Sequence, residues 1–381
     1  MNPKTHSTPP SRIRAQSRQW LLCFIPWLCF AAIRSDGAES GIKHYLYLST
    51  PDAAQPGGSG SGILIFDIDQ GHRFVRRIAV PAFSKEGLRG FCASARNHAA
   101  YYSMTSRRLG CFDLESESVV WEQTYDTGCD RACVTPDGKK LYVPTGWWWR
   151  GTNSGLLVVN PRDGSVMDRI PVGLQAHNSI ASLNGQYVFL GTETALTIFN
   201  TRDNSIAKRI DDVGEAGVFP FTIDSRNEFA YVCLGKHVGF DVVSLREGRA
   251  IHRVTAEASP IPHRTHGAGL TPDGRELWIS DQDGKKLFIF DATKMPPVQI
   301  GQVDLSQGGH GWITFSLDGR YAWCHTPDVI DVKTRKVVAT LKDEQGAPIC
   351  SSKFFEVQMK NGKVVEVGDQ FGLGRKHVER R

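Results

Sequence analysis

Short runs of alternating apolar and polar residues recur along the chain, and a tight-turn signal divides each run. Residues 129–143 read CDRACVTPDGKKLYV, and residues 265–279 read THGAGLTPDGRELWI. Alternation with a period of two predicts half-buried strands, and Pro-Asp-Gly supplies the positive φ that a tight turn needs. Beyond residue 38 the sequence carries no helical periodicity, so the pattern predicts antiparallel hairpins throughout.

The hairpins belong to a longer repeat. More degenerate copies of the strand–turn–strand unit occupy residues 89–103, 176–190, 219–233 and 310–324. A second signature follows each hairpin, as in ILIFDI (63–68), LTIFNT (196–201) and LFIFDA (287–292), and a basic-apolar strand then ends the unit. Four predicted strands recur roughly every 41–47 residues, which is typical of one blade of a β-propeller.

Seven such units can be counted, and the first of them lacks its innermost strand. The segment SSKFFEVQM at 351–359 is a spare strand near the end of the chain. Pairing it into the first unit would close the ring and remove the exposed sheet edges of an open array. We therefore predict an all-β, seven-bladed β-propeller of four-stranded antiparallel blades over residues 39–370, closed by a C-terminal strand.

The segments TPDGKKLYV, TPDGRELWISDQ and LFIFDA, with their repeat period, resemble the YVTN-type (YncE-like) β-propeller repeat proteins. The resemblance covers roughly residues 43–370. It implies a seven-bladed propeller, often exported in bacteria and related in fold to WD40-like and lactonase-type propellers. No common catalytic residue set comes with the family, so the resemblance assigns no site.

The first 38 residues have the layout of an export signal. Basic residues precede an apolar run from Trp20 to Ile33, and small residues follow it. Fourteen apolar residues are short for a membrane span. We expect a secretory signal and a periplasmic or extracellular protein. The alternative is an uncleaved anchor, in which case the signal alone would contact the membrane.

Export changes the charge of the chain. Of 45 Lys and Arg residues five lie in 1–38, and of 40 Asp and Glu residues one does. The remaining 40 basic and 39 acidic residues nearly cancel, and nothing concentrates positive charge as nucleic-acid binding requires. Residues 371–381 form a basic C-terminal tail, which we expect to be solvated. Seven scattered cysteines also remain; at least one must be free, and most are expected to be buried, with one disulfide as an alternative.

The repeat predicts where a site would lie. In a propeller the inner strands begin at one mouth of the central channel, and the Pro-Asp-Gly turns lie at the other end. Residues just before or at the start of these strands should therefore converge, and a Trp-Trp-Trp-Arg loop should lie on the same face. The candidate ligand-binding residues are Arg89, Asp130, Arg131, Trp147, Trp148, Trp149, His177, His266 and His310. The arginines would suit an anionic small molecule.

Histidines are concentrated at this end of the predicted channel. Imidazoles can bind copper or zinc, accept protons, or hydrogen-bond to a ligand. The candidate metal ligands are His177, His263, His266, His310 and His325. We favour the interpretation of a wet, polar channel mouth, or of simple ligand binding there, over a metal site.

Two functions from different classes follow. The first is an exported, monomeric binding or scaffold protein that binds a small molecule or a protein partner at the channel mouth. The absence of a nucleophile elbow, P-loop, haem motif or dinucleotide fingerprint favours it over an enzyme. The alternative is a metal-assisted, lactonase-like hydrolase in which the histidines hold the metal.

Overall fold

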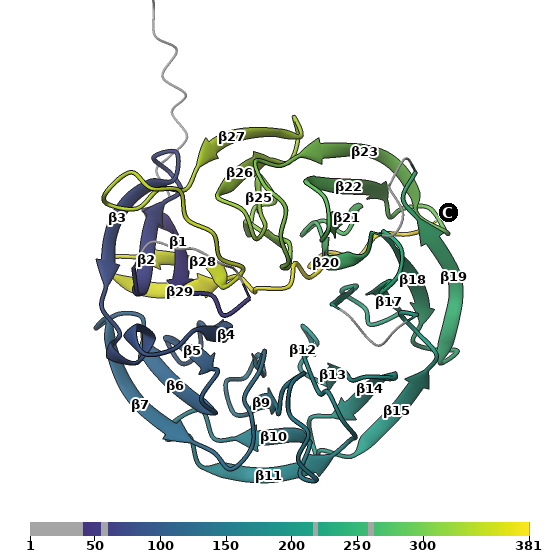
Figure 1. Cartoon of the computed structure of the whole chain (residues 1–381), viewed down its shortest axis with the longest axis horizontal. Coiled ribbons are helices and arrows are strands. Elements are labelled where there is room, and N and C mark those ends of the chain that lie inside the picture. The colour runs from purple at the N-terminus through teal and green to yellow at the C-terminus, as the bar shows by residue number, and fades with distance from the viewer. Residues whose placement is uncertain (1–40, 55–59, 216–219, 258–262, 381) are drawn as a thin grey trace, which may run out of the picture. The chain divides into compact units, whose positions relative to one another are not determined.

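The strands form seven antiparallel sheets around a central axis (Figure 1). The computed structural model of the protein describes residues 41–54, 60–215, 220–257 and 263–380. The predicted seven-bladed β-propeller is confirmed in this part of the chain. Residues 1–38, where we expect the export signal, lie outside the described residues. No helix among the described residues has the length and apolar character of a membrane span.

Six of the sheets contain four consecutive strands, which run in order from the channel to the outer surface. These strands are β4 (Leu88–Ser94), β5 (Ala99–Met104), β6 (Arg108–Asp113) and β7 (Ser118–Thr124); β8 (Cys133–Val134), β9 (Leu141–Pro144), β10 (Gly155–Val159) and β11 (Val166–Pro171); β12 (Ser179–Ala181), β13 (Tyr187–Gly191), β14 (Ala195–Asn200) and β15 (Ile206–Asp211); β16 (Phe221–Ile223), β17 (Phe229–Cys233), β18 (Gly239–Ser244) and β19 (Arg249–Thr255); β20 (Thr265–Leu270), β21 (Glu276–Asp281), β22 (Lys286–Asp291) and β23 (Val298–Asp304); and β24 (Thr314–Phe315), β25 (Tyr321–Trp323), β26 (Asp328–Asp331) and β27 (Lys336–Thr340).

Burial follows the position of a strand within its sheet. All six residues of β5 and of β18 are buried, because neighbouring sheets cover both of their faces. The outermost strand β7 is almost wholly exposed. In every sheet the pairing of the outermost strand with its neighbour contains a register shift. Such bulges increase local twist, and their recurrence shows that the repeat extends to backbone geometry.

Both ends of the described chain contribute to the first sheet. It contains β1 (Ile42–Thr50), β2 (Gly62–Asp67) and β3 (Arg73–Ile78), together with β28 (Phe354–Lys360) and β29 (Lys363–Val367). The predicted closing strand is therefore confirmed as β28, which pairs antiparallel with β1 and matches Tyr47 with Phe355. This sheet has five strands, because β29 adds one beyond the four that the repeat predicts.

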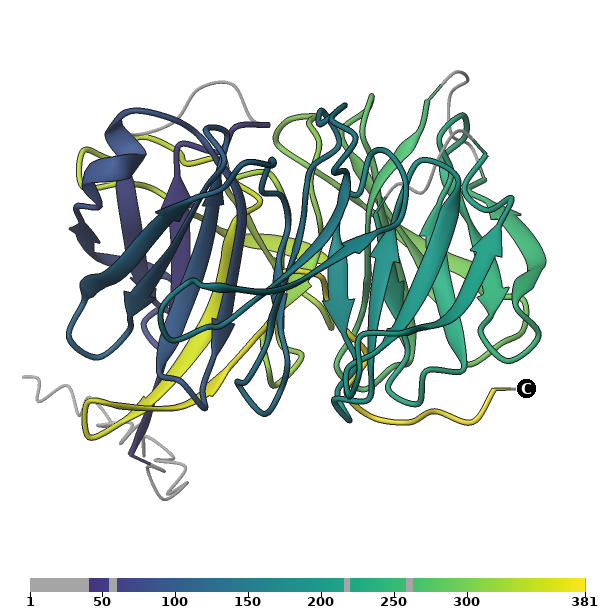
Figure 2. The same ribbon diagram turned by 90° about the horizontal axis from the view of Figure 1, so that it is seen from below.

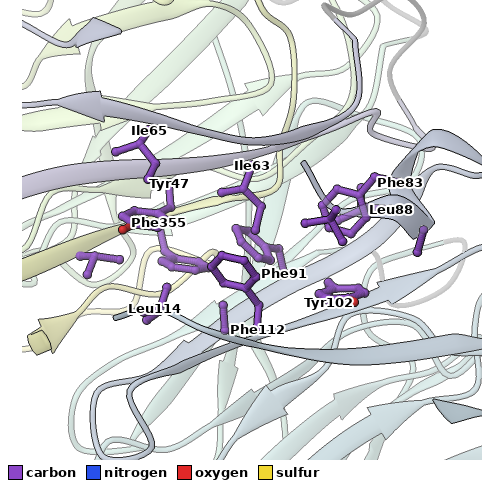
Figure 3. Close-up of a cluster of buried hydrophobic side chains, with 14 of the residues drawn as sticks. Tyr47, Ile63, Ile65, Phe83, Leu88, Phe91, Tyr102, Phe112, Leu114 and Phe355 are labelled. Atoms are coloured by element: carbon purple, nitrogen blue, oxygen red, sulfur yellow. The ribbon is translucent and has the colours of Figure 1, made fainter. Parts of the chain in front are cut away.

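Aromatic side chains pack between the first sheet and the neighbouring sheet that contains β4. Phe355 of β28 lies against Phe91 of β4, with ring centroids 4.5 Å apart (Figure 3). Tyr47 and Phe112 belong to the same buried cluster. A short 3₁₀ turn, η1 (Pro81–Ser84), adds Phe83. Burying several large aromatic side chains at the junction makes ring closure strongly favourable.

The chain beyond β29 crosses the end of the channel instead of extending into solvent (Figures 1 and 2). The Gly372 carbonyl accepts hydrogen bonds from Leu270 N–H and from the Thr222 hydroxyl, both at 2.8 Å. Gly372 has φ +60, and an added Cβ would lie 2.4 Å from the Ile313 carbonyl oxygen. Further on, Arg380 pairs with Asp224 at 2.9 Å. The expectation of a solvated tail over 371–381 is corrected for residues 371–374, which are buried; Lys376, His377 and Glu379 are exposed.

The cysteines behave largely as small buried side chains. All seven in the described part of the chain are free, and only Cys350 is partly exposed. The alternative of one disulfide is therefore not realised among these residues. Burial raises the pKa of the Cys133 thiol to about 12, which keeps it protonated and unreactive at neutral pH.

Candidate functional site

A cavity of about 260 Å³ lies at the channel end where the inner strands begin. Eight of the nine predicted ligand-binding residues line it: Arg89, Asp130, Arg131, Trp147, Trp148, His177, His266 and His310. The ninth, Trp149, does not line this cavity; its indole N–H donates instead to Asn153 Oδ1 at 2.9 Å. Convergence follows from the fold, because each inner strand brings its first residues to the same channel mouth. Whether these residues bind a ligand stays a prediction.

Arg131 is the most unusual residue in the wall. Its side chain is 2% exposed and its guanidinium carbon lies 3.2 Å from the centroid of the Trp312 ring. Nη2 donates to Ser352 Oγ at 3.4 Å, but Nε and Nη1 are buried without a hydrogen-bond partner. Burial lowers the pKa of Arg131 to about 10, although Asp52 and Asp130 oppose this. The group is still cationic at neutral pH, so two nitrogens of a buried cation lack hydrogen-bond partners.

A buried lysine, Lys353, lies beside Arg131. Lys353 Nζ is 3.1 Å from Asp52 Oδ2 and 2.9 Å from Ser352 Oγ. Burial and the Arg131 charge lower the pKa of Lys353 to about 7, and Asp52 opposes them. Burial alone would raise the pKa of Asp52, but Lys353 and Arg131 outweigh it and hold it well below its ordinary value.

Sequence reasoning missed this Asp52–Lys353 pair. Its two members are 301 residues apart and carry no motif. The predicted ring closure was the one signal in the sequence that could have indicated Lys353. Pairing 351–359 into the first sheet brings residue 353 to the channel end at which the other inner strands begin. Trp312, a fully buried residue that packs against Arg131 and Phe371 behind the cavity wall, was missed as well.

His177 and Asp130 form a close pair in the same wall. His177 Nδ1 lies 2.7 Å from Asp130 Oδ2, which also accepts a hydrogen bond from the Trp147 backbone N–H at 3.2 Å. Burial alone would raise the pKa of Asp130, but His177 and then Arg131 lower it below the ordinary value. An ionised Asp130 keeps the Nδ1 position of a neutral His177 protonated, which leaves Nε2 as a hydrogen-bond acceptor.

The other two cavity histidines are neutral. The rings of His266 and His310 lie 3.8 Å apart between centroids. Burial, then the nearby His310, lowers the pKa of His266 well below its usual range. Burial and the charges of Arg131 and Lys353 lower the pKa of His310 to about 3. Neither ring therefore adds positive charge near neutral pH.

The five histidines considered as metal ligands do not form one site. His177 and His266 have ring centroids 6.4 Å apart. His263 pairs with Asp281 at 2.8 Å, and His325 is fully buried with both ring nitrogens lacking hydrogen-bond partners. Across residues 41–54, 60–215, 220–257 and 263–380, no group of three His, Cys, Asp or Glu side chains has an arrangement suited to a metal ion. The described geometry gives copper or zinc no support.

Two of the predicted tryptophans shape the cavity rim. The Arg89 guanidinium carbon lies 3.9 Å from the Trp148 ring centroid, and Arg89 Nε is buried without a hydrogen-bond partner. The Trp147 ring contacts His177, with centroids 5.5 Å apart. Both cavity arginines thus stack on indole faces. Because guanidinium N–H bonds lie in the plane of the group, hydrogen bonds to these arginines form at the guanidinium edges.

Comparisons with known proteins agree with the architecture. The structure is similar to hydrazine synthase of Kuenenia stuttgartiensis, with a TM-score of 0.55 and 16% identity over 65% of this chain and 77% of the other. It is also similar to the dihydro-heme d1 dehydrogenase NirN in complex with DHE, with a TM-score of 0.58 and 15% identity over 86% of this chain and 73% of the other. No family profile and no curated protein matches the sequence. At these identities the likeness shows a shared propeller fold alone.

Proposed function

We propose that this propeller is an exported binding protein that holds a small anionic molecule in the channel-mouth cavity. Arg131 carries the proposal, because it places a buried guanidinium with two unpartnered nitrogens in the cavity wall. A carboxylate or phosphate is the chemical group that matches such a planar donor edge.

The charge around Arg131 supports the same conclusion. Each nearby carboxylate already has another partner, since Asp52 contacts Lys353 and Asp130 contacts His177. Arg89 is a further cation in the wall, and its guanidinium stacks on the Trp148 ring. Burying an excess of positive charge costs free energy, and an anion bound in the cavity would offset that cost.

The concave site favours a small molecule over a protein partner. Arg131 and Arg89 line a cavity, and a flat protein surface would contact only its rim. A metal-assisted hydrolase would need a ligand set that the described residues do not form. The YVTN-type relationship, the periplasmic or extracellular location and the monomeric state stay predictions from the sequence.

The test measures thermal stability against concentration for acetate, succinate, citrate and inorganic phosphate, with sodium chloride matching the ionic strength. A ligand at a hundredfold its Kd should stabilise the folded protein by about 2.7 kcal/mol. Arg131→Met should abolish this gain, while the unligated variant should be at least as stable as the wild type because an unpaired buried cation is gone.

The control is Arg169→Met, which removes an exposed arginine paired with Asp126. It should leave anion binding unchanged. The proposal is wrong if none of the four anions stabilises the wild type, or if Arg131→Met binds them as well as the wild type does.

A further inference from the structure

His177 is held in one orientation by the neighbouring Asp130 carboxylate. Its Nδ1 atom lies 2.7 Å from Asp130 Oδ2, and the Trp147 backbone N–H donates to the same oxygen. Asp130 is 1% exposed, so water does not compete for this contact. A buried carboxylate that accepts from Nδ1 fixes the neutral ring as the Nδ1–H tautomer.

The second nitrogen of this ring is available to a ligand. His177 lines the cavity and its side chain is 14% exposed. Within the described residues, the hydrogen bond of this ring is made through Nδ1, on the side opposite Nε2. In the Nδ1–H tautomer Nε2 carries a lone pair, so it can accept a hydrogen bond. It cannot donate one to a carboxylate oxygen, as a cationic group would.

Arg131 and His177 therefore present opposite hydrogen-bonding character on one surface. Both contact Trp312, with the Arg131 guanidinium carbon 3.2 Å and the His177 ring centroid 5.7 Å from the centre of that ring. Both residues also line the same cavity, so a single small molecule bound there can contact both. It needs an anionic acceptor for Arg131 and a neutral donor for His177.

We propose that the cavity selects small hydroxycarboxylates, with the carboxylate on the Arg131 guanidinium and the hydroxyl donating to His177 Nε2. This inference rests on the proposed anion-binding function and names its ligand class. A carboxylate without the hydroxyl leaves the His177 acceptor unsatisfied in a partly desolvated site, and this loss is the basis of discrimination.

The test compares two pairs of probes that differ by one hydroxyl, lactate with propionate and malate with succinate. Calorimetry at pH 8 keeps ordinary imidazoles neutral. The hydroxyl-bearing member of each pair should bind the wild type several-fold to about tenfold more tightly. His177→Gln should remove most of this preference and retain carboxylate binding.

A second variant covers the case in which His177→Gln fails to fold. Asp130→Asn removes the charge that fixes the tautomer and should reduce the hydroxyl preference without abolishing binding. The matched control is His237→Gln, which disrupts another histidine–carboxylate pair (His237 Nδ1 to Glu215 Oε1, 2.9 Å) outside the cavity wall. It should keep the wild-type preference.

The outcomes separate this inference from the proposed function. If no carboxylate binds, the proposed function fails. If both members of each pair bind the wild type equally, anion binding stands and the selection of hydroxycarboxylates is overturned. If the preference survives in both His177→Gln and Asp130→Asn, the role of His177 is overturned.

Discussion

The two ends of the central channel are formed by opposite ends of the same inner strands, and they satisfy their polar groups in different ways. At the turn end, a hydroxyl bonds to an acid or amide two residues later in copy after copy. These pairs are Thr135 with Asp137, Ser182 with Asn184, Thr271 with Asp273, and Ser316 with Asp318. At the mouth, the partners lie far apart in the sequence.

The difference separates a structural end from a candidate binding end. In these four turns the hydroxyl and its partner lie two residues apart, so this contact forms within a single repeat copy. The mouth depends on pairs between sheets, such as Asp52 with Lys353, and it leaves nitrogens of Arg131 and Arg89 unpartnered. Unsatisfied buried donors lower stability, and they are the groups that a ligand can use.

The largest effect should come from opening the ring. Deletion of residues 350–381 removes β28 and β29, which exposes the edge of β1 and the cluster around Phe91. We expect loss of soluble protein or of a cooperative thermal transition, measured by expression and scanning calorimetry. Truncation after Lys376 is the control, since it keeps both strands and the Gly372 contacts. A soluble deletion with an unchanged melting temperature would disprove closure as the source of stability.

Breaking the buried pair at the mouth should have the next largest effect. Asp52→Asn leaves the Lys353 ammonium beside Arg131 without its carboxylate. We expect a loss of roughly 3–5 kcal/mol in the free energy of unfolding, measured with urea. The double variant Asp52→Asn with Lys353→Met should recover much of it, because no unpaired lysine charge is left. A loss below about 1 kcal/mol in the single variant would contradict this account.

Acid should weaken the fold through its buried histidines. Burial lowers the pKa of His325 to about 4, so this ring stays neutral in the fold while an unfolded histidine gains a proton below about pH 6.5. Between these values the unfolded chain binds more protons, so stability falls as pH falls, by roughly 3 kcal/mol for His325. Urea titrations at pH 7 and pH 4.5 measure this.

The variant His325→Gln should make the pH dependence shallower, because its side chain does not titrate. His377→Gln changes an exposed histidine and should follow the wild type. An unchanged pH slope in His325→Gln would show that other groups control acid unfolding.

The smallest effect should come from the turn end. Asp137→Ala removes the acceptor for the Thr135 hydroxyl and the Lys139 N–H. By analogy with helix caps we expect a loss of about 1 kcal/mol in the free energy of unfolding. Anion binding should not change, since Asp137 lies at the other channel end. A change in anion affinity would contradict the assignment of structural and binding roles to opposite ends of the channel.

Much of the candidate site was predictable because it depends on the repeat. Once 129–143 and 265–279 are recognised as equivalent hairpins, Asp130 and His266 must lie near the same channel mouth. Trp149 does not line the cavity, because its loop is irregular and no repeat position fixes which way an indole turns. The prediction of a metal site also relied on histidines converging at the channel mouth. Metal coordination depends in addition on side-chain directions, which the spacing of residues in the sequence does not determine.

The sequence by itself determined the hairpin period, the number of blades, the spare closing strand and the end of the channel at which polar residues gather. These follow from local turn chemistry and from period-two burial, which act over a few residues. Only the tertiary structure decided that Lys353 pairs with Asp52, that Asp130 orients His177, and that residues 371–380 cross the channel. Such contacts join segments from different blades, so their free energy depends on desolvation and distance after the ring has closed.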